Sequence, residues 1–252
     1  MIIISPSKNL QVNDEVLKFE KTSPFFLSET NQLVKKFKNL DIREIKSLMK
    51  ISDSLATLNH ERFKNINKKN NTKKPAVFLF SGDTFNGLSI RLLDDKSLGF
   101  AQKNLRILSG LYGVLRPFDL IEPYRLEMGT KTDEIIGKNL YNFWGEKLTN
   151  RLNNEIIENG DGFLFNLSSN EYFSVLNASK LKCKIVNFDF KKIKNNKLTS
   201  IGMMIKKLRG AMAKYIIQNK INSFEKIKEF NDLGFQFSEF NNSTNNFLFT
   251  SR

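Results

Sequence analysis

The sequence of 252 residues contains one cysteine, Cys183, and one histidine, His60. A single cysteine excludes a disulfide within the chain and argues against a structural zinc site, which takes four Cys or His ligands. A single histidine, set among charged residues in a helical pattern, argues against a multi-histidine metal site and a histidine-based catalytic triad. We therefore expect no metal site.

Long apolar runs are also missing. No stretch approaches the roughly 20 apolar residues of a membrane span. The first residues, Met1 to Lys8, contain only three consecutive branched side chains and no preceding basic region, too little for a signal peptide. We expect a cytoplasmic protein that does not associate with membranes.

The standard nucleotide and hydrolase signatures are absent as well. The chain has no GxGxxG and no GxxxxGK[ST], so neither a dinucleotide fold nor a P-loop is supported. It has no GxSxG, the turn that carries the nucleophile of many hydrolases. We expect no bound cofactor.

The patterning that is present predicts a mixed α/β (α+β) fold in one domain, residues 1–252. Hydrophobic residues make up 40% and charged residues 26%, ordinary values for a globular protein. No Pro- or Gly-rich linker divides the chain. Apolar runs and turn signals predict strands at 2–4, 75–80, 105–108, 163–167, 184–190, 235–240 and 247–250. Helical spacing predicts a helical block over 29–66 and helices at 140–157, 169–175, 205–219 and 222–230.

The net charge is +14 at pH 7. Such an excess favours a polyanionic partner, nucleic acid first. The competing interpretation is compositional, because 31 lysines against nine arginines, with abundant Asn, Ile and Phe, is typical of an AT-rich genome. The arginines are therefore more informative than the lysines, and Arg106, Arg116 and Arg125 fall within twenty residues of each other.

Four short polar loops follow predicted strands: Ser5–Lys8, Ser81–Asp83, Ser109–Gly113 and Asn166–Tyr172. In open α/β sheets, ligands bind beyond the carboxyl ends of the strands, so the four loops are expected to line one cleft. Each loop taken alone is better explained by the Ser, Gly, Asn and Asp that turns need, and it is the charged residues gathered near the loops that favour a cleft. The charged residues in or near these loops are Lys8, Asp83, Arg116, Arg125, Glu127 and Glu171.

The segment from Leu108 to Gly129 combines a glycine turn with clustered charge. Gly110 and Gly113 bracket Leu111 and Tyr112, as in the hairpin of a helix-hairpin-helix motif, which presents backbone amides to a DNA phosphate. The motif normally has one residue fewer, so a glycine-rich β-turn without a ligand is the alternative. The helix pair around residues 52–63 is a second candidate for the motif, although Thr57 stands where glycine is expected.

The charged half of this segment allows two interpretations. Arg116 with Asp119, and Arg125 with Glu127, have the spacing of structural ion pairs. The same two guanidiniums and carboxylates, held by Pro117 and Pro123, also suit a polar ligand or acid–base chemistry. Both interpretations stay open.

A basic helix is predicted near the carboxyl terminus, over Lys206 to Tyr215. Lys207, Arg209 and Lys214 carry its positive charge, while glycine and alanine between them permit another backbone to approach closely. The helix suits contact with phosphates. A solvated lysine face is the alternative.

The order of motifs resembles the YaaA family of bacterial peroxide-stress proteins. The resemblance extends over almost the whole chain and is most specific over residues 108–129. Family motifs are matched at Ile4-Ser-Pro-Ser-Lys8, 51–56, 80–83, 140–145, Asn166-Leu-Ser-Ser-Asn-Glu-Tyr-Phe173 and 206–212. Ser7 and Phe85 stand where the family commonly has Ala and Tyr.

The resemblance implies a cytoplasmic protein that protects DNA from peroxide damage and limits free intracellular iron. It implies binding of duplex or branched DNA, without sequence specificity, through a positively charged cleft with a helix-hairpin-helix element. No iron-ligand set is visible in the sequence, so we expect the iron effect to be indirect. The expected DNA contacts are Lys8, Gly110, Gly113, Arg116, Arg125, Lys207, Arg209 and Lys214.

Two other functions remain. The first is an enzyme acting on a nucleotide or damaged base in the same cleft, with Lys8, Asp83, Arg125 and Glu127 as catalytic candidates and a nucleotide-like ligand. The second is a structural or partner-binding protein whose charge only reflects composition. Positive charge concentrated in one cleft would favour DNA binding or the enzyme, whereas charge spread evenly over the surface would favour the structural or partner-binding protein.

Overall fold

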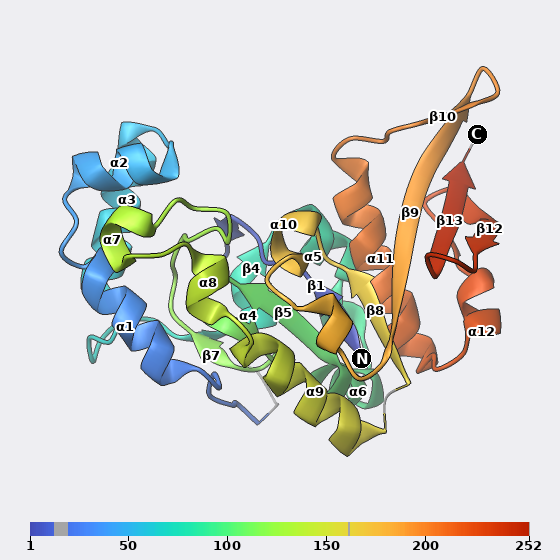
Figure 1. Cartoon of the computed structure of the whole chain (residues 1–252), viewed down its shortest axis with the longest axis horizontal. Coiled ribbons are helices and arrows are strands. Elements are labelled where there is room, and N and C mark those ends of the chain that lie inside the picture. The colour runs from blue at the N-terminus through green and yellow to red at the C-terminus, as the bar shows by residue number, and fades with distance from the viewer. Residues whose placement is uncertain (13–19, 161, 252) are drawn as a thin grey trace.

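A computed structural model describes residues 1–12, 20–160 and 162–251, and a mixed sheet lies at its centre (Figure 1). Within these residues the sheet has nine strands. The central strands β9, β8, β1 and β5 are parallel, and antiparallel strands complete both edges. In spatial order the strands are β11 (Asn231–Asp232), β12 (Phe235–Asn241), β13 (Asn246–Ser251), β9 (Lys184–Lys194), β8 (Phe163–Leu167), β1 (Ile2–Ile4), β5 (Leu105–Ser109) and β6 (Gly113–Leu115), with β10 (Lys197–Thr199) paired to β9.

The predicted mixed α/β fold is confirmed. β1 is the short isoleucine run, and all three of its side chains are buried because helices cover both faces of the central strands. One hydrophobic core includes residues from Met1 to Phe249. The predicted strands at 2–4, 105–108, 163–167 and 184–190 and the terminal hairpin are all present.

The strand predicted at 75–80 is wrong. The segment is instead a two-residue strand β3 (Lys74–Pro75), one helical turn α4 (Ala76–Leu79) and a two-residue strand β4 (Phe80–Ser81). β3 pairs with β7 (Leu120–Ile121), and β4 pairs with β2 (Asn9–Leu10). All residues of α4 are buried. A continuous apolar run of this kind indicates burial but does not distinguish a strand from a helix.

The helical block predicted over 29–66 is three helices, α1 (Leu27–Phe37), α2 (Ile42–Met49) and α3 (Asp53–Asn65). Asp41 begins α2 with a capping box, since its carboxylate accepts from the Glu44 amide while the Glu44 carboxylate accepts from the Asp41 amide. Ser52 caps α3. The remaining helices not described below are α7 (Asp133–Ile136), α12 (Phe224–Lys228), η1 (Ile90–Leu92) and η2 (Ala178–Lys180).

The single helix predicted at 140–157 is wrong, because it is two helices, α8 (Leu140–Trp144) and α9 (Lys147–Asn159). The break is at Gly145, whose φ of 50° and ψ of −132° lie outside the helical region. The turn lets the Trp144 indole point inward, where Nε1 donates to the carbonyl of Gly110 at 3.0 Å. Tertiary packing of one tryptophan therefore sets this boundary.

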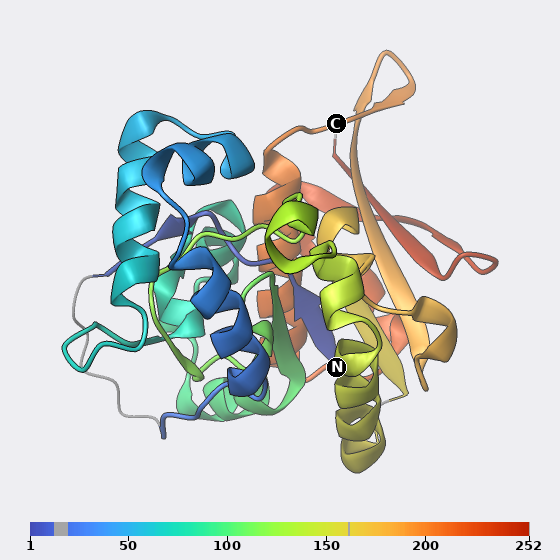
Figure 2. The same ribbon diagram turned by 60° about the vertical axis from the view of Figure 1, so that its left-hand side comes forward.

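Helices α9 and α11 (Met204–Asn219) lie on opposite faces of the central strands (Figures 1 and 2). α11 crosses α5 (Asp83–Leu88) in close contact, and α6 (Asp95–Asn104) lies beside it. A β-carbon at Gly87 would lie 2.0 Å from the Lys207 carbonyl oxygen, and one at Gly210 would lie 1.9 Å from that of Thr84. Gly210 of α11 thus permits the close approach of the α5 backbone, as expected from the sequence for the small residues of this helix.

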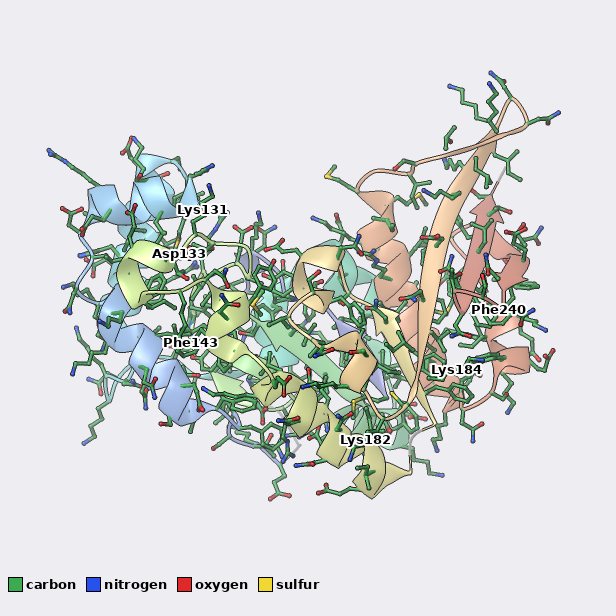
Figure 3. The ribbon with its side chains drawn as sticks, in the orientation of Figure 1. Lys131, Asp133, Phe143, Lys182, Lys184 and Phe240 are labelled. Atoms are coloured by element: carbon green, nitrogen blue, oxygen red, sulfur yellow. The ribbon has the colours of Figure 1, made fainter. Side chains whose placement is uncertain are left out.

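Aromatic rings hold the C-terminal strands together. The rings of Phe224, Phe240 and Phe247 lie 4.4 to 5.5 Å apart, between centroids. Lys184, at the start of β9, places its ammonium 4.9 Å from the Phe224 ring, and Figure 3 shows Lys184 near Phe240. This end of β9 is anchored in the core, and the other end leaves the sheet.

Candidate functional site

A pocket of about 410 Å³ lies at the carboxyl edge of the sheet. β1 and β8 are parallel, with Ile4 opposite Leu167, so the loops that follow them leave the sheet side by side. This is the edge where open α/β sheets bind ligands. The pocket is lined by Ser5, Pro6, Ser7, Lys8, Asn9, Gly82, Asp83, Thr84, Tyr124, Arg125, Leu126, Glu127, Leu167, Ser169, Glu171, Tyr172, Lys206 and Arg209.

Hydrogen bonds join two of the lining loops directly. The backbone amide of Ser169 donates to Ser5 Oγ at 2.8 Å, and the two hydroxyl oxygens lie 3.3 Å apart. Loops 5–9 and 168–172 are therefore fixed to each other, although 164 residues separate Ser5 from Ser169. Both serines line the pocket, so this link fixes two of its loops relative to each other.

One wall carries a chain of three charges. Glu127 accepts from Lys8 Nζ at 2.5 Å through one oxygen and from Arg125 Nη2 at 3.1 Å through the other. The Nε of Arg125 is buried without a hydrogen-bond partner within the described residues. Arg125 thus keeps a donor unused beside the pocket, in a part of the site where water is largely excluded.

The glycine hairpin positions this wall. A β-carbon at Gly110 would lie 2.3 Å from the Leu126 carbonyl oxygen, so only glycine lets the Leu126 backbone rest on the hairpin. Tyr124, on the same segment, is anchored by a 2.6 Å hydrogen bond between its hydroxyl and Ser109 Oγ. The flanking side chains of Arg125 and Glu127 consequently lie in the pocket.

Burial raises the pKa of two tyrosines that line the pocket, Tyr124 and Tyr172, well above the ordinary value of 10. The Tyr124 hydroxyl bonds to Ser109, and that of Tyr172 bonds to the backbone of Met128. Both phenols stay neutral at physiological pH and are held in hydrogen bonds, so neither is poised for proton transfer.

Three other charged side chains that line the pocket make no ion pair within the described ranges: Asp83, Lys206 and Arg209. Asp83 is exposed in the first turn of α5. Burial lowers the pKa of Arg209, partly offset by the more distant carboxylate of Asp189, but the guanidinium stays charged. Arg209 is therefore available to bind an anion in the pocket.

Glu171 closes the pocket on a third side. Its Oε1 accepts from the backbone amide of Gly129 at 2.9 Å, and its carbonyl accepts from the Tyr141 hydroxyl at 3.0 Å. The carboxylate thus fixes the end of the 108–129 segment against α10 (Asn170–Phe173). Its role is positional within this structure.

The structure brings together six of the charged residues singled out in the sequence: Lys8, Asp83, Arg125, Glu127, Glu171 and Arg209. All four catalytic candidates therefore share one pocket, and three of the expected DNA contacts, Lys8, Arg125 and Arg209, line it. Lys8, Arg125 and Glu127 are paired with one another. Of the four polar loops, the loop at 109–113 does not line the pocket, and the segment at 124–127 takes its place.

Arg116 lies outside the pocket. Its guanidinium pairs with the fully buried Asp119 at 2.9 Å, donates to the Ser23 carbonyl, and lies 4.3 Å from the centre of the Phe25 ring. Asp119 in turn accepts from Thr22 and the Arg116 amide. The contacts match the structural ion pair that the spacing allowed.

The interpretation of Gly110 to Gly113 as a helix-hairpin-helix hairpin is wrong. These residues join strands β5 and β6, with Ser109 opposite Gly113. Both glycines are buried, and a β-carbon at Gly113 would lie 2.8 Å from the Trp144 ring. The spacing of the glycines reflects packing against Leu126 and Trp144, so neither glycine is available as a DNA contact.

The second candidate for that motif is a helix pair. α2 and α3 pack together and are joined by three residues, with Lys50 in the left-handed conformation and Thr57 inside α3. α3 also carries Arg62, whose pKa is lowered by burial and by the nearby charge of Arg125. Arg62 was not predicted from the sequence, because no motif marks it.

The described residues contain no cluster of metal-ligating side chains. Within the part of the chain that the structure describes, no three His, Cys, Asp or Glu side chains are grouped so that they could hold a metal ion. No helix in the same part is long and apolar enough to cross a membrane.

Comparison with known proteins agrees with this arrangement of motifs. The family described as peroxide stress protein YaaA matches residues 1–241. The chain belongs to the YaaA family. A UPF0246 protein of Legionella pneumophila (strain Corby) is 44% identical over 252 residues, covering 99% of this chain and 98% of the relative.

Other relatives match over a similar share of the chain. UPF0246 proteins of Idiomarina loihiensis and Rickettsia peacockii are 43% and 44% identical over 251 and 247 residues. These matches cover 99% and 98% of this chain and 97% and 98% of the relatives. The YaaA-like sequence pattern therefore spans the sheet, the pocket loops and α11 together.

Proposed function

We propose that this YaaA-family chain is a cytoplasmic peroxide-stress protein, acting as a single domain, that binds DNA without sequence specificity. The DNA backbone lies across the mouth of the pocket, and bound protein shields it from peroxide damage. The lowering of free iron is indirect in this proposal, since no three His, Cys, Asp or Glu side chains of the described residues are grouped to hold a metal ion. Duplex DNA is the primary partner, and branched DNA presents the same phosphates.

The observation that carries this proposal is the distribution of charge. Between Asp189 and Glu225 the chain has nine Lys or Arg and no Asp or Glu. Acidic residues make up 26 of 252 overall, so a stretch of 35 would ordinarily hold three or four. An AT-rich composition raises lysine everywhere but does not remove carboxylates from one region.

The fold places this acid-free stretch beside the pocket. Lys206 and Arg209 line the pocket from α11, and Lys207 is exposed on the same helix. None of the three makes an ion pair within the described residues, unlike Lys8, Arg125 and Arg116. Uncommitted cations supply most of the non-specific affinity for DNA because they release counterions from phosphates.

Replacing Lys206, Lys207 and Arg209 together by alanine tests this proposal. We expect the slope of log affinity against log salt for a mixed-sequence duplex to become shallower by about 2.7, at roughly 0.9 for each phosphate that is no longer neutralised. Fluorescence anisotropy with a labelled duplex of about 30 base pairs between 0.05 and 0.3 M salt would measure the slope. Affinity at physiological salt should fall roughly tenfold or more.

The matched control removes the same charge from another surface, with Lys68, Lys69 and Lys73 changed to alanine. These lysines are exposed in the loop after α3. The control should keep most of the affinity and slope. Equal losses in both variants would mean that only net charge matters, and absence of duplex binding at 0.05 M salt would refute the proposal.

A second candidate function is binding, or chemical conversion, of a nucleotide-like molecule in the pocket. The observation that favours it is a cavity of about 410 Å³, typical of small-ligand sites, lined by Arg209 without an ion pair among the described residues and by Arg125, whose Nε has no hydrogen-bond partner there. Lys8, Asp83 and Glu127 would complete the polar walls. The Lys8–Glu127–Arg125 pairing favours a binding role over an exposed catalytic base.

Thermal unfolding with nucleoside monophosphates at millimolar concentration tests the pocket. A ligand that binds the folded state raises the Tm in proportion to the logarithm of its concentration above Kd. We expect the wild type to respond and Arg209→Ala to lose the response, while the exposed Lys69→Ala keeps it. No response from any monophosphate would rule out the nucleotide-like ligand and leave the DNA proposal unaffected.

A further inference from the structure

The hairpin formed by the end of β9 and by β10 projects from the sheet. Figures 1 and 2 both show it rising clear of the rest of the chain. β9 has eleven residues, twice the length of β8, its parallel neighbour. Pairing of β9 with β13 reaches Lys192, and beyond it the only described partner of β9 is β10.

The hairpin leaves the same sheet edge as the pocket. β9 runs parallel to β8, with Asn187 opposite Asn166, and continues seven residues further to Lys194. At roughly 3.3 Å per residue the tip extends on the order of 20 Å past that pair. Residues 200–203 then lead directly to α11, whose Lys206 and Arg209 line the pocket.

Strand alternation divides the hairpin into two faces. Lys192, Lys194 and Lys197 fall on one face, because Lys194 pairs with Lys197 and Lys192 pairs with Thr199. Ile193 and Leu198 pair on the other face and are 37% and 55% exposed. All three lysines are exposed, and the described residues offer none of them a carboxylate.

This arrangement costs stability in the free protein. A two-stranded ribbon without a third strand is marginal in water. Like charges directly opposite each other, as at Lys194 and Lys197, destabilise a ribbon further. Asn195 and Asn196, with φ of 51° and 55°, form the tight two-residue turn that keeps the ribbon narrow. A polyanion bound to the lysine face would remove the repulsion.

We infer that this ribbon, Lys192 to Thr199, is a second DNA contact that enters the major groove of the duplex bound over the pocket. The major groove admits a two-stranded ribbon and is about 8.5 Å deep. From Lys192, the last β9 residue paired with β13, to Asn195 at the turn is three residue steps, roughly 10 Å. The inference rests on the proposed function, and it specifies double-stranded DNA and a clamp formed by the ribbon and α11.

The lysine face explains why such contact would be independent of sequence. Lysine ammoniums reach phosphates on both sides of the groove as point charges and carry no base code. Ile193 and Leu198 give the ribbon an apolar back that groove walls can cover. Single strands lack a groove, so they would meet the pocket and α11 but not this element.

The test replaces Lys192, Lys194 and Lys197 by alanine and compares duplex with single-stranded DNA of equal length. We expect the salt slope for the duplex to fall by about 2.7 and duplex affinity to drop roughly tenfold or more, with a clearly smaller loss for the single strand. The triple arginine variant should keep duplex affinity. Thermal stability should be unchanged or slightly higher, since the Lys194–Lys197 repulsion is gone.

The control is again the triple alanine variant at Lys68, Lys69 and Lys73, which changes the net charge equally. If the wild type binds duplex and the α11 variant loses affinity while the ribbon variant matches the control, the ribbon inference is wrong and the proposed function stands. Equal losses for duplex and single strand would exclude groove entry. If the wild type binds no duplex at 0.05 M salt, both proposals fail.

Discussion

Glu155→Ala is expected to destabilise the protein by about 3–5 kcal/mol, because it leaves a buried guanidinium without its carboxylate. Glu155 receives two hydrogen bonds from Arg106, at 2.8 and 3.1 Å, and one from Arg151 at 2.8 Å. The side chains of Arg106 and Glu155 are only 4% and 5% exposed. The ion pair ties β5 to α9, so its loss loosens the strand that carries the glycine hairpin.

Chemical denaturation monitored by circular dichroism measures this effect. Glu146→Ala provides the control, since Glu146 precedes α9 and pairs with Lys180 while both side chains are more than half exposed. An exposed pair contributes roughly 0–1 kcal/mol, so the control should unfold almost as the wild type does. A loss below about 1 kcal/mol for Glu155→Ala would show that Arg106 finds other partners or water.

Gly110→Ala is expected to cost about 3 kcal/mol, at the upper end for inserting one methyl group into a packed site. The new β-carbon would lie 2.3 Å from the Leu126 carbonyl oxygen and 3.1 Å from the carbonyl carbon. Both neighbours are backbone atoms, so no side-chain rotation relieves the contact. The displaced segment also carries Arg125 and Glu127, so the pocket should change with it.

Gly99→Ala is the matched control for the same chemical change. Gly99 is exposed within α6, and a β-carbon there would meet no heavy atom of the described residues within 4 Å. Alanine in a helix interior is more stable than glycine by up to about 1 kcal/mol, so this variant should gain stability. Thermal unfolding of both variants gives the comparison, and a Gly110→Ala protein as stable as the wild type would contradict the packing role.

Local chemistry made much of the fold predictable. Asp41 and Glu44 form the capping box that their spacing indicated, and the isoleucine run at 2–4 is the buried strand β1. The failures occurred where burial on all sides removes periodicity, as in Ala76–Leu79. The helix break at Gly145 could not be predicted from the sequence pattern, because it depends on where the Trp144 indole packs.

The candidate site was predicted in part. Lys8, Asp83, Arg125 and Glu127 do share one pocket. Lys8 follows the parallel strand β1, as the rule for open sheets predicts. Asp83 follows β4, and Arg125 and Glu127 follow β7, strands that pair outside the main sheet, so their arrival at the pocket depends on tertiary packing. Arg116 lies outside the pocket and forms the ion pair with Asp119 that its spacing allowed. The absence of Asp and Glu from residues 190–224, which supports the proposed DNA contact, is visible in the sequence but is found by counting carboxylates and not lysines.

By itself, the sequence determined the YaaA family, the mixed α/β class and the excess of positive charge, because motif order and composition are properties of the linear chain. Only the tertiary structure decided which charges are already neutralised and which are free. Arg106 and Arg116 are held by Glu155 and Asp119, whereas Arg209 is uncommitted at the pocket among the described residues. Ion pairing depends on distances of a few ångströms between residues far apart in sequence, and such distances exist only after folding.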